Sequence, residues 1–323
     1  MILYIAVPCY NEEDVLPETA ARLKKKLEAL VQQDVISDQS RICFIDDGSK
    51  DMTWHIIQEL HKQNKIFNGI KLSRNCGHQN ALLCGLLKLK DYADVVISLD
   101  ADLQDDINAI DKMLEKYLIE CCDIVYGVRE KRKTDTLFKR ITAEGFYKVM
   151  KILGANIVFN HADYRLMSRQ ALEGLAQFRE TNLFLRGIVP MVGYKSDVVY
   201  YERHERFAGT SKYPLRKMLA FAWEGITSLT TRPIAFITRL GIGMFGIGII
   251  MLIYFLLRHV AGHTVIGWSS LIVSIWAIGG LQLLSIGIIG EYIGKIYLET
   301  KARPRSIIEV FLANEQQQFV NNT

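Results

Sequence analysis

The N-terminal part of the chain alternates between short apolar runs and longer amphipathic stretches. Each run is partly β-branched, which is typical of a buried strand. The runs cover 2–7, 41–45, 69–72, 95–99 and 123–127. The stretches between them carry apolar residues at helical spacing, and we expect helices over about 13–32 and 51–61, and a third that follows residue 79 and runs to about 89. Strands alternating with helices predict βαβ units and a mostly parallel, Rossmann-like α/β sheet covered on both faces.

Polar loops follow the first four runs, and they read PCYNEE, DDGSKD, SRNCGHQ and DADLQD. Ligands of open α/β sheets bind outside the carboxyl ends of the strands, so these loops are candidates for one site. We expect Pro8 to end the first strand, because it lacks a donor, and Asn11 to cap the helix that follows. Asp46 or Asp47 can accept from a base or ribose, and Arg74 can pair with phosphate.

The fourth loop carries the densest group of acids. Asp100, Asp102 and Gln104 are oxygen ligands suited to Mg²⁺ or Mn²⁺ shared with substrate phosphates. The alternative is a solvated turn whose acids cap the next helix. Because polar loops follow four successive strands, the ligand-binding interpretation is favoured.

Several function classes are disfavoured. There is no GxGxxG after the first run and no GxxxxGK[ST], which argues against a nicotinamide or flavin Rossmann enzyme and against a P-loop NTPase. A net charge of +4 gives no case for nucleic acid. The six cysteines show no zinc-site spacing, so we interpret them as reduced thiols in a cytosolic compartment. No basic segment precedes the first apolar run, which predicts no secretory signal.

Basic residues gather in the middle of the chain. Arg129 and Arg140 are candidates for an anionic ligand, because arginine offers a planar fork to phosphate. Asp163 and Arg165 lie two residues apart in an expected strand, and 203–213 is a basic, glycine-containing loop. The alternative for the basic segments is a solvated surface.

Two uncharged stretches, 240–257 and 264–290, are long enough to cross a bilayer. A short connection predicts an antiparallel hairpin, and the flanking Lys and Arg place both ends in the cytoplasm. Residues 217–231 are expected to form an amphipathic helix in the interface. The tail after residue 307 is expected to be frayed. Glycines in both stretches allow close packing, which suggests a homo-oligomer, either a dimer or a tetramer.

The loop motifs Pro8–Glu12, Asp46–Ser49, Ser73–His78 and Asp100–Asp105 resemble the GT-A nucleotide-sugar-binding domain of family 2 glycosyltransferases. Three further segments, 163–169, 206–213 and 290–294, resemble those of polyprenyl-phosphate glycosyltransferases. Within that group the closest match is to bactoprenol (undecaprenyl-phosphate) glucosyltransferases, and the chain is also similar to dolichol-phosphate mannose synthases. The resemblance extends to about residue 305. One departure is His161-Ala162 before Asp163, where a glycine-containing lead-in is expected.

The resemblance implies a metal-dependent, inverting transfer of a hexose, expected to be glucose, from a UDP-sugar to undecaprenyl phosphate. It implies a GT-A catalytic domain over 1–213, an interfacial helix over 214–233, transmembrane helices over 234–258 and 264–294, and a cytoplasmic tail over 295–323. The protein would lie in the bacterial inner membrane, with its catalytic domain cytoplasmic. A flippase and a lumen-side glycosyltransferase would then use the product for cell-envelope glycan modification.

The resemblance also implies roles for single residues. Donor binding is assigned to Pro8, Tyr10, Asn11, Glu12, Asp46, Asp47, Lys71, Arg74, Asn75, Gly77, His78, Asp100, Ala101 and Asp102. The acceptor phosphate is assigned to Arg129, Arg140, Arg165, Arg206, Ser211 and Lys212. Asp102 binds the metal with Asp100 and Gln104, and Asp163 is either a general base or the group that orients the arginines.

Three alternatives stay open. UDP-N-acetylglucosamine or another nucleotide sugar can be the donor, since no residue decides between them. A processive polysaccharide synthase shares the first loops but usually has a Gln-x-x-Arg-Trp motif and more spans. A membrane-tethered nucleotide-sugar sensor or scaffold would keep the donor pocket without needing Asp163.

Overall fold

The computed structural model describes residues 1–129, 161–180, 184–202 and 268–313, with scattered residues between 234 and 257. The strands in these ranges are β1 Leu3–Cys9, β2 Arg41–Asp46, β3 Phe67–Leu72, β4 Val95–Ser98, β5 Ile124–Arg129, β6 His161–Ser168, β7 Ser196–Tyr201 and β8 Ile308–Leu312. The helices are α1 Leu16–Gln32, α2 Thr53–Gln63, α3 His78–Leu89, α4 Ala109–Leu118, α6 Arg169–Ala176, α7 Leu185–Met191 and α10 Trp268–Lys301.

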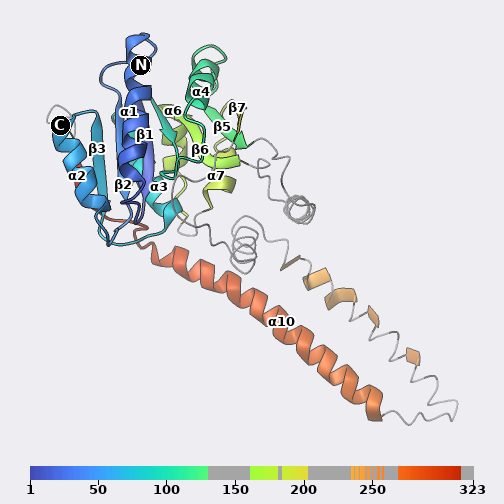
Figure 1. The fold of residues 1–323 in the computed structure, drawn as a ribbon. Coiled ribbons are helices and arrows are strands. Elements are labelled where there is room, and N and C mark those ends of the chain that lie inside the picture. The colour runs from blue at the N-terminus through green and yellow to red at the C-terminus, as the bar shows by residue number, and fades with distance from the viewer. Residues whose placement is uncertain are drawn as a thin grey trace.

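The described strands form one sheet in the order β7-β5-β6-β4-β1-β2-β3-β8 (Figure 1). β1 pairs in parallel with both β2 and β4, β2 with β3, and β5 with β7. β6 runs antiparallel between β4 and β5, and β8 runs antiparallel along β3. The predicted mostly parallel sheet is confirmed. The strand order reverses between β1 and β4, which is where open α/β sheets bind ligands.

Helices cover both faces of the sheet. α1, α2 and α4 pack on one face through buried residues such as Leu23, Ile57 and Met113. α3, α6 and α7 pack on the other, with Leu86, Leu172 and Ile188 buried. Because both faces are buried, the central strands are apolar throughout: each residue of β1 is buried. The polar loops are therefore confined to the strand ends.

Two local predictions at the first loop are wrong. Pro8 lies inside β1, where it pairs with Ile45, and the ladder continues to Cys9 opposite Asp46. Each residue of a parallel strand directs its N–H to one neighbour only, so one missing donor does not end the strand. Asn11 does not cap α1, which begins at Leu16. Its backbone is left-handed instead, with φ of 53°.

The prediction of a frayed tail after residue 307 is also wrong for the residues that the structure describes. Ile308–Leu312 form β8, which pairs antiparallel with β3 from Gly69 to Leu72. β3 would otherwise be an edge of the sheet with unpaired backbone groups, and an apolar strand satisfies them. Residues 314–323 lie outside the described residues.

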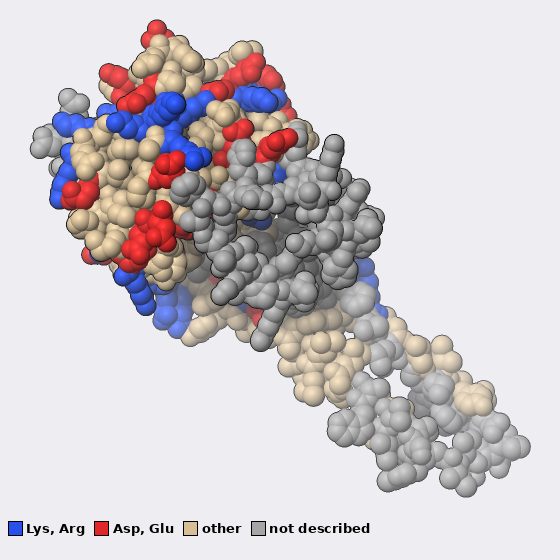
Figure 2. Space-filling view, viewed as in Figure 1, with Lys and Arg blue, Asp and Glu red and all other residues tan. Residues whose placement is uncertain are grey.

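α10 extends away from the sheet as a long arm (Figure 1). Its 34 residues correspond to about 50 Å at 1.5 Å per residue. Apolar side chains are exposed along it, among them Ile275, Leu283 and Ile286, and its described surface away from the sheet carries no Lys, Arg, Asp or Glu (Figure 2). Among the described residues, one segment, Ile278–Lys301, is long and apolar enough to cross a membrane.

The other predicted membrane elements fall largely beyond the description. The described residues between 234 and 257 are helical, but the two-helix hairpin is not established by them. The predicted interfacial helix over 214–233 lies outside the described residues.

Candidate active site

The loops after β1 and β2 are joined by hydrogen bonds that main-chain N–H groups donate to side-chain oxygens. The Asn11 N–H donates to Ser49 Oγ at 3.0 Å, and the Lys50 N–H donates to Asn11 Oδ1 at 2.9 Å. The Glu12 N–H donates to Thr53 Oγ1 at 2.9 Å. Asn11 thus connects two loops, a role for which its left-handed backbone is well suited.

Asp47 joins the second loop to the third. Its carboxylate accepts from the N–H of Cys76 at 2.7 Å and of Gly77 at 2.9 Å. Gly48 beside it has φ of 67°, and a Cβ there would lie 2.7 Å from main-chain atoms of Arg74 and Asn75. The Asp-Asp-Gly-Ser sequence is therefore required at this position for geometry as well as for any ligand contact.

Asp46 is buried and only partly satisfied. Its Oδ1 accepts from the Ser49 N–H at 3.2 Å, while Oδ2 has no hydrogen-bond partner. Burial raises the pKa of this carboxyl, and the nearby Lys71 opposes the rise. Lys71 itself forms an ion pair with Glu309 of β8 at 3.0 Å. An unsatisfied buried carboxylate oxygen is suited to accept from a ligand donor.

The acidic loop after β4 presents the expected metal ligands. Burial, and then the neighbouring carboxylates of Asp105, Asp163 and Asp102, raise the pKa of Asp100 to about 6, although His78 opposes the shift. The Asp102 carboxylate accepts from the Gln104 N–H at 3.2 Å. A carboxyl crowded by other carboxylates is stabilised in its charged form by a cation. This oxygen-donor set therefore fits Mg²⁺ or Mn²⁺.

A second group of candidate metal ligands lies at the N-terminal end of β5, whereas Arg129 and the acidic loop lie at its C-terminal end. Glu120, Cys122 and Asp197 bring ligand atoms within 4.8 Å of one another. Lys116 pairs there with Glu120 at 3.3 Å and with Asp197. The Lys116 ammonium already contacts both carboxylates and offsets part of their charge, so the group is explained without a metal.

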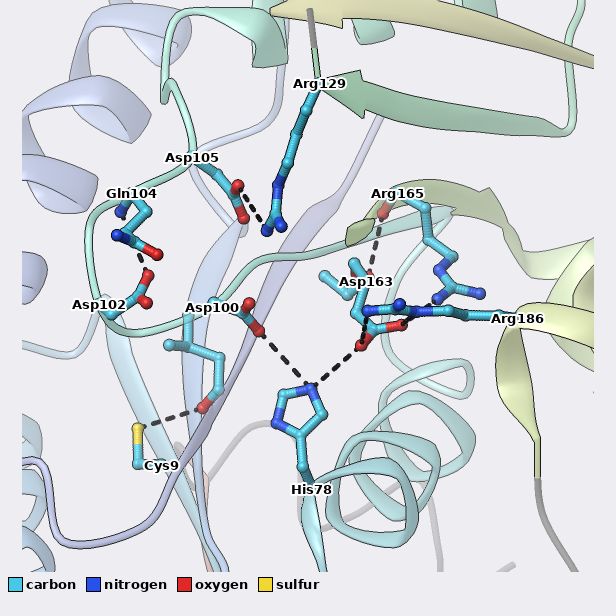
Figure 3. Close-up of polar contacts among 12 residues, drawn as sticks. Cys9, His78, Asp100, Asp102, Gln104, Asp105, Arg129, Asp163, Arg165 and Arg186 are labelled. Atoms are coloured by element: carbon cyan, nitrogen blue, oxygen red, sulfur yellow. Dashed lines mark hydrogen bonds and ion pairs between the residues drawn. The ribbon is translucent and has the colours of Figure 1, made fainter. Parts of the chain in front are cut away.

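Asp163 lies opposite Asp100 across neighbouring strands. β4 and β6 pair with Val95 opposite Ser168 and Ser98 opposite Arg165, and two further residues of this register bring Asp163 to Asp100. The imidazole of His78, from the first turn of α3, lies between them (Figure 3). Its Nε2 is 3.5 Å from Asp100 Oδ1 and 3.4 Å from Asp163 Oδ2. Burial would lower the pKa of His78, but Asp163 and Asp100 raise it above its ordinary value.

Two arginines complete the surroundings of Asp163. Arg165 Nη2 donates to Asp163 Oδ1 at 2.7 Å, and Arg186 Nη2 lies 3.4 Å from Oδ2 (Figure 3). Burial would raise the pKa of Asp163, but His78, Arg186 and Arg165 together hold it well below its usual range. Asp163 is therefore ionised at neutral pH and is a weak proton acceptor.

Arg165 is buried, with 1% of its side chain exposed, and its Nε and Nη1 have no hydrogen-bond partner. Its pair with Asp163 keeps a guanidinium charge inside the domain, where an unpaired charge would be very costly. Arg186 is 31% exposed and thus closer to solvent.

Arg129 anchors the acidic loop. Its Nη2 lies 3.2 Å from Asp105 Oδ1 (Figure 3). Its Nε donates to Tyr201 Oη at 3.2 Å. Tyr201 also donates to Asp105 at 2.6 Å. This network links the loop after β4 to β5 and β7.

The other predicted site residues vary in their surroundings. Tyr10 is exposed. The Ala101 carbonyl accepts from the Thr19 hydroxyl at 2.7 Å, and the Asn75 carbonyl accepts from Arg74 at 3.3 Å. Arg140, Arg206, Ser211 and Lys212 lie outside the described residues. Sequence reasoning missed Arg186, which lies in no motif. It also missed the anchoring role of Asp105, because the motif that contains Asp105 does not signal a contact with Arg129.

The family model of Glycosyl transferase family 2 matches residues 4–175. The chain belongs to this family. Its mostly parallel sheet, with acids after β4, has the GT-A organisation expected of family 2. An uncharacterized family relative, YkoT of Bacillus subtilis, is 54% identical over 98% of this chain and 93% of its own.

The bactoprenol glucosyl transferase of Shigella phage SfX is 40% identical over 96% of this family 2 chain and 99% of its own. The predicted resemblance to bactoprenol glucosyltransferases is thus confirmed. Among solved structures, mannosyl-3-phosphoglycerate synthase from Rubrobacter xylanophilus covers 69% of this chain and 71% of its own, with 15% identity and a TM-score of 0.47. That likeness is too low to carry a functional argument.

Proposed function

We propose that this glycosyltransferase transfers glucose from UDP-glucose to undecaprenyl phosphate at the cytoplasmic face of the bacterial membrane, with inversion at the sugar. The observation that carries the proposal is that His78 lies between two groups of different net charge: the acidic loop with Asp100, and Asp163 with its two arginines. Asp100 lies on its donor side, and Asp163, backed by two arginines, lies on the other. The name of the Shigella phage relative supports the acceptor and the sugar.

The donor side must stabilise a departing nucleoside diphosphate. Asp100, Asp102 and Gln104 would hold Mg²⁺ or Mn²⁺, which when bound offsets the negative charge of the diphosphate. Asp46, with its unsatisfied oxygen, accepts a hydrogen bond from the base or ribose. Arg74 and the other residues of the first three loops complete the proposed donor site.

The acceptor side must bring one anion next to another. A phosphomonoester has a second pKa of about 6, so at neutral pH its oxygen attacks the anomeric carbon without giving up a proton. One C–O bond to the acceptor forms as the bond to the diphosphate breaks, which inverts the anomeric centre. A general base is therefore unnecessary, in keeping with the low pKa of Asp163.

We assign Asp163 to positioning. Its two oxygens hold His78, Arg165 and Arg186 in one cluster. The partly exposed Arg186 then offers its guanidinium to the acceptor phosphate, together with Arg140, Arg206, Ser211 and Lys212. Arg129 acts through Asp105 and the acidic loop. Fixed cations facing the acceptor offset the repulsion between the two anions.

The membrane arrangement is part of the proposal. Exposed apolar side chains along α10 and at Ile242, Ile247 and Ile250 support two spans that cross the bilayer as a hairpin. Both termini and the catalytic domain would lie in the cytoplasm, next to the phosphate of a lipid acceptor. A flippase and a lumen-side glycosyltransferase would act on the product, and a homo-oligomer is proposed from the glycines of the spans.

The test is transfer from radiolabelled nucleotide sugars to undecaprenyl phosphate in membranes that contain the protein, with Mg²⁺, Mn²⁺ or EDTA. The expected result is a chloroform-soluble labelled product with UDP-glucose that disappears with EDTA. A product with UDP-N-acetylglucosamine alone would replace the sugar and keep the reaction. Nucleotide binding with no lipid product from any donor would instead support the sensor alternative.

A further inference from the structure

We propose that the segment after α10, residues 305–312, positions the donor-side loop at 73–78. The inference rests on the proposed function for its kinetic consequence. Its structural part rests only on contacts between described residues. α10 ends at Lys301, and β8 begins at Ile308.

The segment contacts the main chain where the loop begins. The Ser73 N–H donates to the Ile307 carbonyl at 3.0 Å, directly after the β3–β8 ladder, in which Leu72 pairs with Ile308. The first residue of the loop is thus held by the residue before β8. A main-chain hydrogen bond at this point fixes the direction in which the chain leaves β3.

The ladder is irregular at the same place. Lys71 pairs with Val310 and Leu72 with Ile308, which leaves Glu309 as the extra residue of a bulge. Bulges redirect side chains and are frequent next to active sites. The Glu309 carboxylate contacts Lys71 at 3.0 Å, the lysine that opposes the raised pKa of Asp46.

The segment also packs against the helix in which the loop ends. Lys88 Nζ of α3 lies 5.1 Å from the centroid of the Phe311 ring, and the ring of Tyr92, which follows the end of α3, lies 5.6 Å from that ring. α3 begins with His78 at its N-terminus. Residues 305–312 therefore hold both elements that flank the loop, β3 before it and α3 after it. Arg305 adds a third anchor by donating to the Phe178 carbonyl at 2.9 Å.

The experiment uses the full-length protein in nanodiscs and compares Phe311→Ala and Glu309→Ala with Glu309→Asp, which keeps the charge. Tyr200→Ala on β7 is the control, since Tyr200 is an exposed aromatic residue at the opposite edge of the sheet. Amide hydrogen exchange is followed at 73–78 and at 100–108, and donor KM and kcat are measured.

The expected result for Phe311→Ala is exchange at 73–78 that is about tenfold faster, with 100–108 unchanged. Donor KM should rise about fivefold while kcat stays within about twofold, because a loosened loop weakens donor binding rather than the chemical step. Glu309→Ala should have a smaller effect in the same direction, and Glu309→Asp should restore part of it. Tyr200→Ala should leave 73–78 unchanged.

Unchanged exchange at 73–78 in both Phe311→Ala and Glu309→Ala would overturn the inference. A uniform rise at 73–78 and 100–108 would also overturn it, because it would mean general destabilisation. If Phe311→Ala fails to fold, the exchange rates of Glu309→Ala test the inference. That variant should fold, because it removes only a half-exposed side chain. If the wild-type protein transfers no sugar, the proposed function fails, and the exchange measurements still test the positioning role.

Discussion

The donor-side loops and the Asp163 cluster lie side by side but are held together differently. The loops after β1, β2 and β3 are joined by main-chain amides that donate to Asp47, Asn11 and Ser49. The Asp163 cluster is joined by charged side chains, with His78 and two arginines around one carboxylate. The first network depends on the main-chain geometry of the loops, whereas the second depends on the balance of charge around Asp163. The comparison predicts that the two halves fail in different ways.

The largest effect is expected on the donor side, from Asp102→Ala. Losing a metal ligand should lower transfer about 1,000-fold, because the diphosphate charge is no longer offset. Expression and membrane insertion should be intact, since Asp102 lies in a loop. Asp111→Ala on α4, which removes a half-exposed carboxylate paired with Lys26, is the matched control and should be near normal. Near-normal turnover of Asp102→Ala would exclude the metal assignment.

Asp163→Asn tests the charged half. Turnover should fall about 100-fold while UDP binding stays within about twofold of wild type. The variant should also unfold at lower temperature, because the buried Arg165 loses its counter-charge. Kinetics and calorimetry on the same preparation separate the two effects. The pH–rate profile discriminates the roles of Asp163: loss of an acidic limb in Asp163→Asn would favour a general base and contradict positioning.

Gly48→Ala tests whether the amide-linked half is set by close main-chain packing. The backbone of Gly48 is left-handed, and an added Cβ would lie 2.7 Å from main-chain atoms of Arg74 and Asn75. The substitution should therefore displace the third loop and weaken UDP binding about 30-fold. Gly193→Ala is the control, since Gly193 has φ of 80° but nothing nearer than 3.9 Å to an added Cβ. Titration calorimetry with UDP measures both. Equal UDP affinities in the two variants would rule out the packing argument.

The smallest effect is expected from pH. The pKa of Asp100 is raised to about 6, so a proton competes with the metal below that pH. Mn²⁺ affinity should therefore fall about tenfold between pH 7.5 and pH 5, and the rising charge of His78 acts in the same direction. Calorimetric titration with Mn²⁺ checks this. A pH-independent affinity would mean that Asp100 is not a ligand.

The sequence carried much of the fold because its signals are local. Apolar runs at 95–99 and elsewhere predicted strands whose observed bounds differ by at most two residues at either end. The acids after β4 could be assigned to the ligand-binding edge of the sheet, since parallel strands end together. Local signals gave wrong predictions at two residues. At Pro8 the pairing with β2 outweighs the tendency of proline to end a strand, and at Asn11 a hydrogen bond to the second loop replaces the expected helix cap.

Other parts of the site depend on contacts between distant residues. Arg186 has no motif around it, and it lies beside Asp163 only because the folded chain brings α7 to the site. Arg165 was predicted for the acceptor phosphate, yet it is buried against Asp163. Glu309 could not be connected with Lys71, since 238 residues separate them.

The sequence by itself determined the first five strands, which loops carry carboxylates and glycines, and to which family the chain belongs. Those properties follow from hydrophobic periodicity and from residue types that only certain backbones or ligands require. The tertiary structure decided that His78 lies between Asp100 and Asp163, that Asp163 is held ionised by two arginines, and that β8 closes the sheet beside β3. Strand register and long-range ion pairs decided these, because the free energy of a contact depends on the folded neighbours and not on adjacent residues.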